Sequence, residues 1–185
     1  MASNMSILFI GCGRGEEIAA YDDDMSEILG LEPSKECRLD AQRRLSGRRN
    51  VTLLPDSVFD CTGRRFDRIY AVFPSPRMLL LREDAFATAV LHLLSDDGCF
   101  TLYSEIWPER GNAAMCLGCE RLKQCFRQAG MRVQERIMNY PELPGFVRGS
   151  GFLSRAQPDT PLTFREVRVY GSDVPAYALT ADDHR

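Results

Sequence analysis

Short apolar runs alternate with helix-like segments from one end of this chain to the other. Such alternation is the pattern of a mostly parallel β-sheet whose strands are connected by helices on both faces. The chain is therefore predicted to have an α/β fold, and its 185 residues suffice for one domain spanning residues 1–185. The expected strands are Ser6–Ile10, Glu27–Leu31, Asn50–Leu54, Phe66–Phe73, Cys99–Tyr103, Met131–Met138 and Phe164–Tyr170, and the expected helices are Glu16–Tyr21, Ser34–Gly47, Glu83–Leu94 and Ala113–Ala129.

One long segment interrupts the alternation. From Pro141 to Pro161 the chain is rich in proline and glycine, and its apolar residues follow neither the helical nor the strand periodicity. We expect an irregular insertion at about residues 141–162, and segments of that length are usually functional lids or disordered. Glycines near Phe146 and Phe152 favour a lid that closes on top of the bound substrate. The chain begins almost at its first strand, so we expect this segment, and not N-terminal helices, to cover the substrate. A contact within a homodimer and a disordered loop stay open as alternatives.

Charge and composition exclude several classes of function. The net charge of −3 lacks the positive excess that nucleic-acid binding usually needs, so a nucleic-acid partner is disfavoured. No stretch reaches the roughly 18 apolar residues of a membrane helix, and the start of the chain does not have the pattern of a secretion signal. The seven cysteines, an odd number, indicate reduced thiols rather than a disulfide framework. A cytoplasmic protein without membrane contact is expected.

Three cysteines in CLGCERLKQC raise the question of a metal site, because C-x-x-C is a common ligand pair. At about 100° per helical residue, Cys125 lies about 180° round from Cys116 and points away from it. The helix instead carries one apolar stripe, formed by Met115, Cys119, Leu122 and Phe126. We expect buried cysteines here and no metal.

The glycines of GCGRG, Gly11, Gly13 and Gly15, stand between a buried strand and a helix. Glycines let the backbone turn sharply and approach a ligand, and the amides at a helix N-terminus carry partial positive charge. About 20 residues further on, Glu32 ends the second strand, where an acid can accept both hydroxyls of a ribose. The two features predict a nucleotide-like ligand, either NAD or an adenosine-containing methyl donor. Glu16 occupies the last glycine position of the dinucleotide fingerprint and favours the cationic methyl donor over a pyrophosphate.

Several ordered motifs resemble the class I S-adenosylmethionine-dependent methyltransferases. ILFIGCGRG looks like the first motif of that family, FDRIYAVFPSP matches its fourth strand and the motif that follows, and DDGCFTLYSE resembles its D-G-G turn and fifth strand. The resemblance covers about Ile7 to Gly171. It implies a Rossmann-like, seven-stranded sheet that ends in an antiparallel hairpin, with S-adenosylmethionine (SAM) as the cofactor.

The resemblance also implies roles for individual residues around the cofactor. Glu32 would bind the ribose, Asp56 would contact the adenine amino group, and Ser57 and Val58 would line the adenine ring. The implied cofactor-binding residues are Gly11, Cys12, Gly13, Gly15, Glu32, Pro33, Asp56, Ser57 and Val58.

The F-P-x-P segment after the fourth strand looks like that of the tRNA guanine 7-methyltransferase branch, which reads F-P-D-P-W before a basic run. Here Ser75 replaces the acid, Arg77 replaces the tryptophan, and MLLLRED replaces the basic run. These departures favour a small-molecule acceptor over tRNA, and we expect methylation of a ring or amine nitrogen, which needs little help from a base. A binding subunit that keeps the donor pocket without chemistry is an alternative. The expected catalytic residues are Phe73, Pro74, Ser75 and Glu105, and the expected acceptor-binding residues are Pro76, Arg77, Tyr103 and Trp107.

Overall fold

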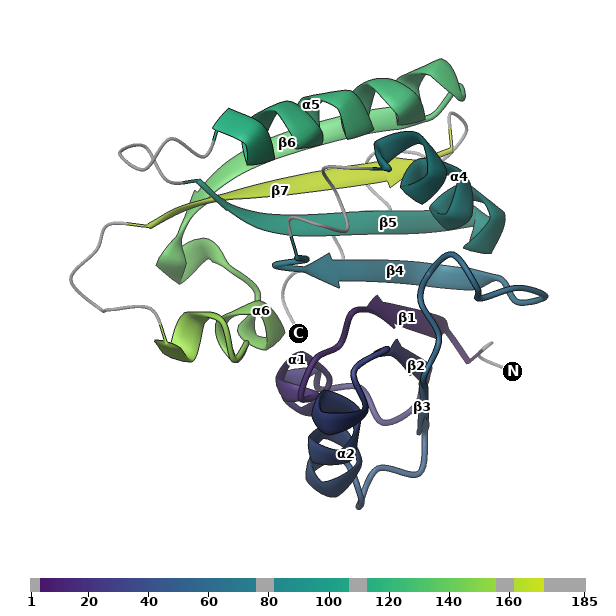
Figure 1. The fold of residues 1–185 in the computed structure, drawn as a ribbon, viewed down its shortest axis with the longest axis vertical. Helices are drawn as coiled ribbons and strands as arrows, with labels where there is room; N and C mark the ends of the chain where they lie inside the picture. The colour runs from purple at the N-terminus through teal and green to yellow at the C-terminus, as the bar shows by residue number, and fades with distance from the viewer. Residues whose placement is uncertain (1–3, 76–81, 107–112, 156–161, 172–185) are drawn as a thin grey trace.

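A computed structural model describes residues 4–75, 82–106, 113–155 and 162–171, of which 113–116 and 155 are described by their backbone alone. Its centre is a seven-stranded sheet in the order β3-β2-β1-β4-β5-β7-β6 (Figure 1). β7 runs antiparallel to both of its neighbours, while the other pairings are parallel. The predicted α/β, Rossmann-like sheet with a terminal antiparallel hairpin is therefore confirmed.

The elements follow the predicted order closely. The strands are β1 (Ser6–Ile10), β2 (Glu27–Leu31), β3 (Val51–Leu54), β4 (Phe66–Val72), β5 (Leu94–Ile106), β6 (Arg132–Asn139) and β7 (Thr163–Tyr170). The helices are α1 (Glu16–Ala20), α2 (Lys35–Arg44), α4 (Glu83–Leu93), α5 (Ala113–Gln128) and α6 (Gly145–Arg148), with short 3-10 helices η1 (Tyr140–Glu142) and η2 (Leu153–Arg155).

Helices cover both faces of the sheet, which explains why β1 is apolar from Ile7 to Ile10. Along β1, Leu8 and Ile10 pack in one core cluster with residues of α4 and α5. Ile7 and Phe9 point to the opposite face and pack in a second cluster with residues of α1, α2 and α6. A strand that is buried on both faces has no solvent-exposed side, so apolar and polar residues do not alternate along it. No helix within the described ranges is both long and apolar enough to cross a lipid bilayer.

The start of β5 differs from the expectation. The turn predicted at Asp96–Gly98 does not separate α4 from the strand, because β5 begins at Leu94, immediately after the helix. Leu94 pairs with Phe66 and Cys99 pairs with Arg68, so the register shifts between them. The polar residues that signal a turn therefore form an irregularity within the strand.

The cysteine-containing helix α5 buries the stripe that its spacing predicts. Cys119, Leu122 and Phe126 are almost fully buried against the sheet, in the cluster that α5 shares with α4. The Met115 and Cys116 side chains lie outside the described residues. Within the described parts of the chain, no three His, Cys, Asp or Glu residues are grouped as metal ligands.

The segment after β6 is more ordered than its composition suggests. It contains η1, α6 and η2 instead of continuous irregular chain, up to residue 155. Leu143, Val147 and Leu153 are buried in the same cluster as β1 and α1. Each short helix has too few residues to produce a helical periodicity in the sequence. Single apolar side chains nevertheless anchor these helices to the core. Residues 156–161 lie outside the described residues.

The contact between α6 and α1 depends on a glycine, and we predict that Gly149→Ala destabilises the protein by about 1–3 kcal/mol. A Cβ on Gly149 would lie 2.8 Å from the Cβ of Ala20, and neither group can turn away. Gly145→Ala in the same helix is the matched control, because a Cβ there meets nothing within 4 Å. Urea unfolding of both variants measures the difference, and equal midpoints would contradict the close packing.

Candidate functional site

The predicted site residues lie where the parallel strands end. Ile10 pairs with Leu31, and Leu31 pairs with Leu54, so β1, β2 and β3 finish at the same edge of the sheet. The chain after each of these strands enters a loop on that edge. In open α/β sheets this carboxyl edge is the usual position of a ligand.

The glycine turn after β1 adopts a backbone that other residues rarely take. Gly11, Gly13 and Gly15 have φ angles of 66°, 54° and 77°, all in the left-handed region. The turn is tied to β2, because the Cys12 amide donates to the Leu31 carbonyl at 3.0 Å. Three alternating left-handed residues bend the chain sharply from β1 into α1, which explains why the sequence has glycine at these positions.

Glu32 is bonded directly to this turn. One of its carboxylate oxygens accepts from the Gly13 amide at 2.9 Å, and the other accepts from the Ser34 amide at 2.8 Å. The Gly13 amide in the predicted ligand-binding turn therefore already has an acceptor in this structure. The carboxylate is held in a fixed position, and each oxygen keeps capacity to accept a hydroxyl as well.

The start of α2 holds the other end of Glu32. Arg38 donates from Nη1 to the Glu32 carbonyl at 2.7 Å. Ser34 is the N-cap of α2, with its side chain accepting from the Cys37 amide, as its position in the sequence predicts. Pro33 lies between them and is exposed. The loop after β2 is therefore rigid on both sides of the carboxylate.

The predicted adenine-binding residues lie in the loop after β3. The Glu32 amide donates to the Leu54 carbonyl, so this loop and the loop after β2 begin side by side. Asp56 is half-buried. Ser57 donates its hydroxyl hydrogen to Asp60, and Val58 is a core side chain that packs with Leu31. Their contacts with a cofactor stay predictions.

The negative charge of Glu16, which disfavours a dinucleotide ligand, is partly neutralised by an arginine. Its carboxylate lies 3.2 Å from Nη2 of Arg44, and about a fifth of its side chain is exposed. It also touches the segment after β6, because a Cβ on Gly151 would lie 2.9 Å from Oε1 of Glu16. The charge of Glu16 therefore counts less against a pyrophosphate than the sequence suggests.

The segment after β4 contains a strained backbone position. Phe73 has a φ of 46°, the one left-handed residue other than glycine in the described chain. Such a conformation costs on the order of 1–3 kcal/mol and persists where neighbours fix it. The Phe73 amide donates to the Tyr103 carbonyl at 2.9 Å, and the buried Pro74 follows. Ser75 is exposed.

Two predicted acceptor-side residues come from β5. Glu105 is half-buried near the carboxyl end of the strand. Tyr103 is 2% exposed, and its hydroxyl donates to Oε1 of Glu166 at 2.9 Å. Burial, and then the negative charge of Glu166, raises the pKa of the Tyr103 hydroxyl well above its usual range. This hydroxyl is occupied within the protein. Pro76, Arg77 and Trp107 lie outside the described residues.

Sequence reasoning missed Glu166 and its neighbour Arg168, which form a buried ion pair at 3.0 Å. A signal was available, because strict alternation in FREVRVY puts Phe164, Glu166 and Arg168 on one face of the strand. Charged residues on a face that also carries a buried phenylalanine indicate partners across the sheet. In the structure, the partner of Glu166 is Tyr103, in the directly opposite register position.

The two phenylalanines of the predicted lid have different surroundings. The Phe146 ring packs among four other rings, at centroid distances of 5.1–6.1 Å. The Phe152 ring stacks on Phe73, with centroids 4.6 Å apart and planes 27° apart, and has no other ring contact among the described residues. Both rings are half-buried against the same core cluster, but Phe146 lies among several rings, whereas Phe152 lies beside the strained segment after β4. The rings around Phe146 belong to Phe9, Tyr21, Tyr70 and Tyr103.

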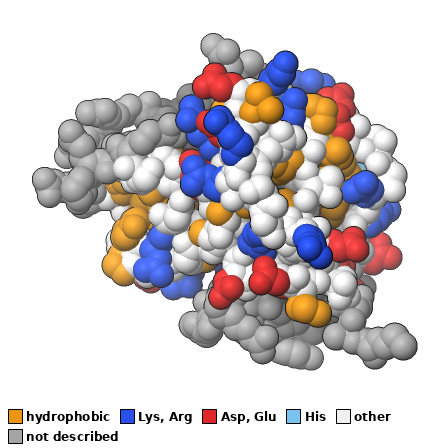
Figure 2. All heavy atoms as spheres, turned by 90° about the horizontal axis from the view of Figure 1, so that it is seen from below, with side chains coloured by type: hydrophobic (Ala, Val, Ile, Leu, Met, Phe, Trp, Pro, Cys, Tyr) orange, Lys and Arg blue, Asp and Glu red, His pale blue; other side chains and the backbone are white. Residues whose placement is uncertain are grey.

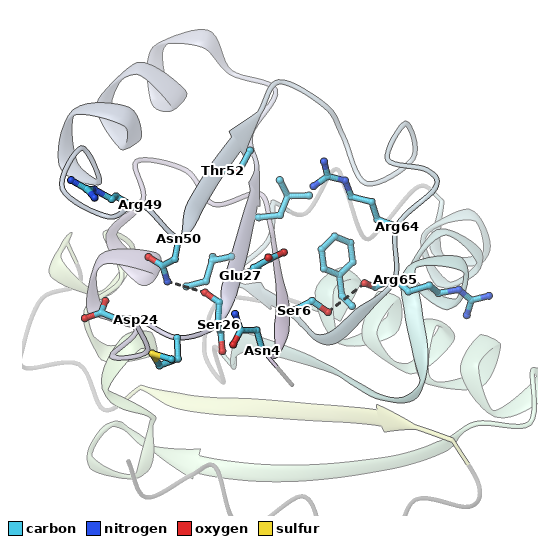
Figure 3. Close-up of a pocket in the computed structure, with 14 residues that line it drawn as sticks. Asn4, Ser6, Asp24, Ser26, Glu27, Arg49, Asn50, Thr52, Arg64 and Arg65 are labelled. Atoms are coloured by element: carbon cyan, nitrogen blue, oxygen red, sulfur yellow. Dashed lines mark hydrogen bonds between the residues drawn. The ribbon is translucent and has the colours of Figure 1, made fainter. Parts of the chain in front are cut away.

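A groove lies at the opposite edge of the sheet. Figure 3 shows this groove, of about 880 Å³, with Ser6, Glu27 and Asn50 among the residues that line it. These residues stand at the amino ends of β1, β2 and β3. Positive and negative side chains are mixed there, with Arg64 and Glu27 both labelled in the view. The groove is separate from the carboxyl-edge loops.

The fold matches solved structures of methyltransferases, while no family model and no curated sequence matches the chain. The 16S rRNA (adenine(1408)-N(1))-methyltransferase of Catenulisporales acidiphilia, solved with the cosubstrate SAM, has a TM-score of 0.71 at 12% identity, over 94% of this chain and 89% of that chain. The 16S rRNA methyltransferase KamB has a TM-score of 0.69 at 13% identity, over 91% of this chain and 88% of that chain. Precorrin-6y C5,15-methyltransferase from Geobacter metallireducens has a TM-score of 0.59 at 14% identity, over 91% of this chain and 80% of that chain. The chain therefore has the fold of class I SAM-dependent methyltransferases.

We predict that Cys12 in the glycine turn resists alkylation in the native protein. Burial, and then the nearby Glu32 carboxylate, raises the pKa of the Cys12 thiol to about 12. Only the thiolate reacts readily, so at pH 8 iodoacetamide should leave Cys12 unmodified in the folded chain and modify it in urea. Peptide mass mapping measures this, and rapid native labelling of Cys12 would show that the turn is open.

Proposed function

We propose that the protein is a SAM-dependent methyltransferase that methylates a nitrogen of a small heteroaromatic or amine metabolite. The observation that carries the proposal is the Glu32 carboxylate, fixed at the end of β2 and bonded to the glycine turn after β1. A fixed acceptor of two hydroxyls beside a close backbone approach suits the ribose of an adenosine. The fold, shared with a methyltransferase that holds SAM, supports the same ligand.

The residues on the carboxyl edge fit the two halves of such a reaction. Glu32 and Asp56 would hold the adenosine, and when bound SAM supplies an electrophilic methyl carbon on a sulfonium sulfur. Phe73 and Ser75 follow β4 beside the glycine turn and would align an acceptor nitrogen. Alignment and exclusion of water are the main tasks in such a transfer. A nitrogen lone pair needs no strong base, and Glu105 would orient the acceptor.

The charge distribution supports a small acceptor over a nucleic acid. Figure 2 shows acidic and basic side chains interspersed on the face seen from below. Many arginines near the glycine turn are paired, including Arg14 with Asp40 at 3.1 Å and Arg44 with Glu16. Paired charges contribute little to phosphate binding, which depends on the release of counterions by net positive surfaces.

A binding subunit without catalysis is the alternative, and calorimetry followed by transfer assays separates it from an enzyme. We expect the protein to bind SAM and S-adenosylhomocysteine and not NADH. With a panel of purine- and pteridine-like compounds, we expect methyl transfer to a nitrogen. Donor binding without transfer to any compound would favour the binding subunit, and methylation of phenol oxygens alone would contradict the proposed acceptor class.

The Glu32→Ala variant is predicted to bind SAM at least about tenfold more weakly than the natural chain. The variant loses a charged acceptor for the ribose hydroxyls, and hydrogen bonds to charged groups contribute about 1.5–3 kcal/mol. Glu36→Ala is the control, because Glu36 is 81% exposed and pairs only loosely with Arg14, at 3.5 Å. Titration calorimetry with SAM measures both, alongside circular dichroism to verify folding. Equal affinities of Glu32→Ala and Glu36→Ala would remove Glu32 from the site.

A further inference from the structure

We infer that the Phe152 ring occupies the acceptor position, and that the acceptor is a planar aromatic ring that displaces Phe152 and stacks on Phe73. The inference rests on the proposed function and narrows its acceptor class from heteroaromatic or amine compounds to planar heteroaromatic ones. Phe152 would then be a specificity-determining residue that competes with the acceptor for one aromatic face.

The face in question belongs to a ring held by its backbone. Phe73 adopts its left-handed φ of 46° directly after β4, and its amide is bonded to the Tyr103 carbonyl. Phe164 packs against the edge of the ring, with centroids 5.9 Å apart at 61°. Fixed in these ways, the Phe73 ring presents a defined flat face, and Phe152 stacks on it. A strained, fixed residue is the kind of position at which function is concentrated.

The turn that carries Phe152 bridges the two halves of the site. Gly151 lies against the carboxylate of Glu16, in the first turn of α1 after the glycine turn. The next residue, Phe152, reaches the segment after β4. The methyl donor and the acceptor must meet between these two elements, so the Phe152 ring lies next to the place of transfer. The sequence separation from Phe73 to Phe152 hides this proximity.

The neighbours of Phe152 are anchored, so its ring can move without the segment. Ser150 is fully buried and its hydroxyl accepts from the Leu153 amide, while the Leu153 side chain is 7% exposed. Phe152 itself is half-buried, packs on the surface of the cluster that contains Val147 and Leu153, and stacks its ring on Phe73. A rotamer change of one half-buried ring is fast, whereas displacement of the buried residues on either side would disrupt the core. This segment therefore acts through one side chain.

A planar acceptor is favoured because it recovers the lost stack. Aromatic pairs contribute about 0.5–1.5 kcal/mol beyond the burial of their area. A planar heteroaromatic ring on Phe73 regains this interaction, while an aliphatic amine displaces Phe152 and regains none of it. The protein then discriminates between planar heteroaromatic compounds and aliphatic amines at the binding step, before methyl transfer.

The test measures binding of quinoline, a planar nitrogen heterocycle, and of cyclohexylamine by NMR titration in the presence of S-adenosylhomocysteine. Removal of the competing ring in Phe152→Ala should strengthen quinoline binding about two- to tenfold, and Phe73→Leu should weaken it by a similar factor. Phe59→Ala is the control, because Phe59 packs against Phe86 in the cluster on the other face and should change neither. Cyclohexylamine binding should also strengthen in Phe152→Ala, because the competing ring is then absent for any ligand, but it should not change in Phe73→Leu, because cyclohexylamine has no aromatic stack to lose.

Weaker quinoline binding by Phe152→Ala, or no change in either variant, would overturn the inference. Weakening would mean that Phe152 forms one wall of the pocket and does not compete with the acceptor. Calorimetry with SAM on the same proteins keeps the two proposals apart. SAM binding with unchanged quinoline affinities rejects the role of Phe152 and leaves the proposed function intact, whereas absence of SAM binding in the natural chain rejects the proposed function whatever the quinoline affinities.

Discussion

The hydrogen bond between the Gly13 amide and the Glu32 carboxylate joins the two loops on which the proposed donor site depends. Gly13 follows β1 and Glu32 follows β2, and the parallel pairing of these strands brings both to one edge. The carboxylate satisfies an amide that would otherwise face the solvent or a ligand, and so fixes the turn and the acid together. A ligand entering here meets a site that is already assembled, which lowers the cost of ordering on binding.

The proposed acceptor side depends on a second set of contacts that runs through Tyr103. Its carbonyl holds the Phe73 amide, and its hydroxyl donates to Glu166 on β7. Glu166 is 4% exposed and pairs with Arg168, so its charge is compensated inside the sheet. Removing one member of such a buried set leaves the others without partners, which is costly. The antiparallel β7 thus positions the segment after β4 from the far side of β5.

Much of the donor side could be predicted from the sequence, because its signals are local. Glycines at Gly11, Gly13 and Gly15 after an apolar run require a turn, and an acid at Glu32 after the next run reaches the same edge in any parallel sheet. The bond between Gly13 and Glu32 was not predictable, because the sequence shows which residues share an edge but not which polar groups satisfy one another.

The acceptor side was less predictable, because its contacts join distant residues. Tyr103 and Glu166 are 63 positions apart, and although the alternation in FREVRVY indicates that Glu166 has a partner across the sheet, it does not identify Tyr103 as that partner. The segment around Phe146 and Phe152 has the composition of a loop, and sequence alone gives the two rings the same role. Their difference arises from packing, since Phe146 lies among four other rings and Phe152 stacks on Phe73 beside the strained segment.

The order found in that segment changes what a mobile element at this site can be. Val147 and Leu153 are buried in the core, and Gly149 packs closely on Ala20, so opening the whole segment would expose apolar surface. Each fully buried aliphatic side chain contributes about 1.5–3 kcal/mol, and a segment held by several of them stays closed at equilibrium. Access to the carboxyl edge therefore depends on groups that can move singly. Phe152 is half-buried between anchored neighbours, and its side chain can move by itself. Moving this one side chain costs less free energy than opening the whole segment as a hinged lid.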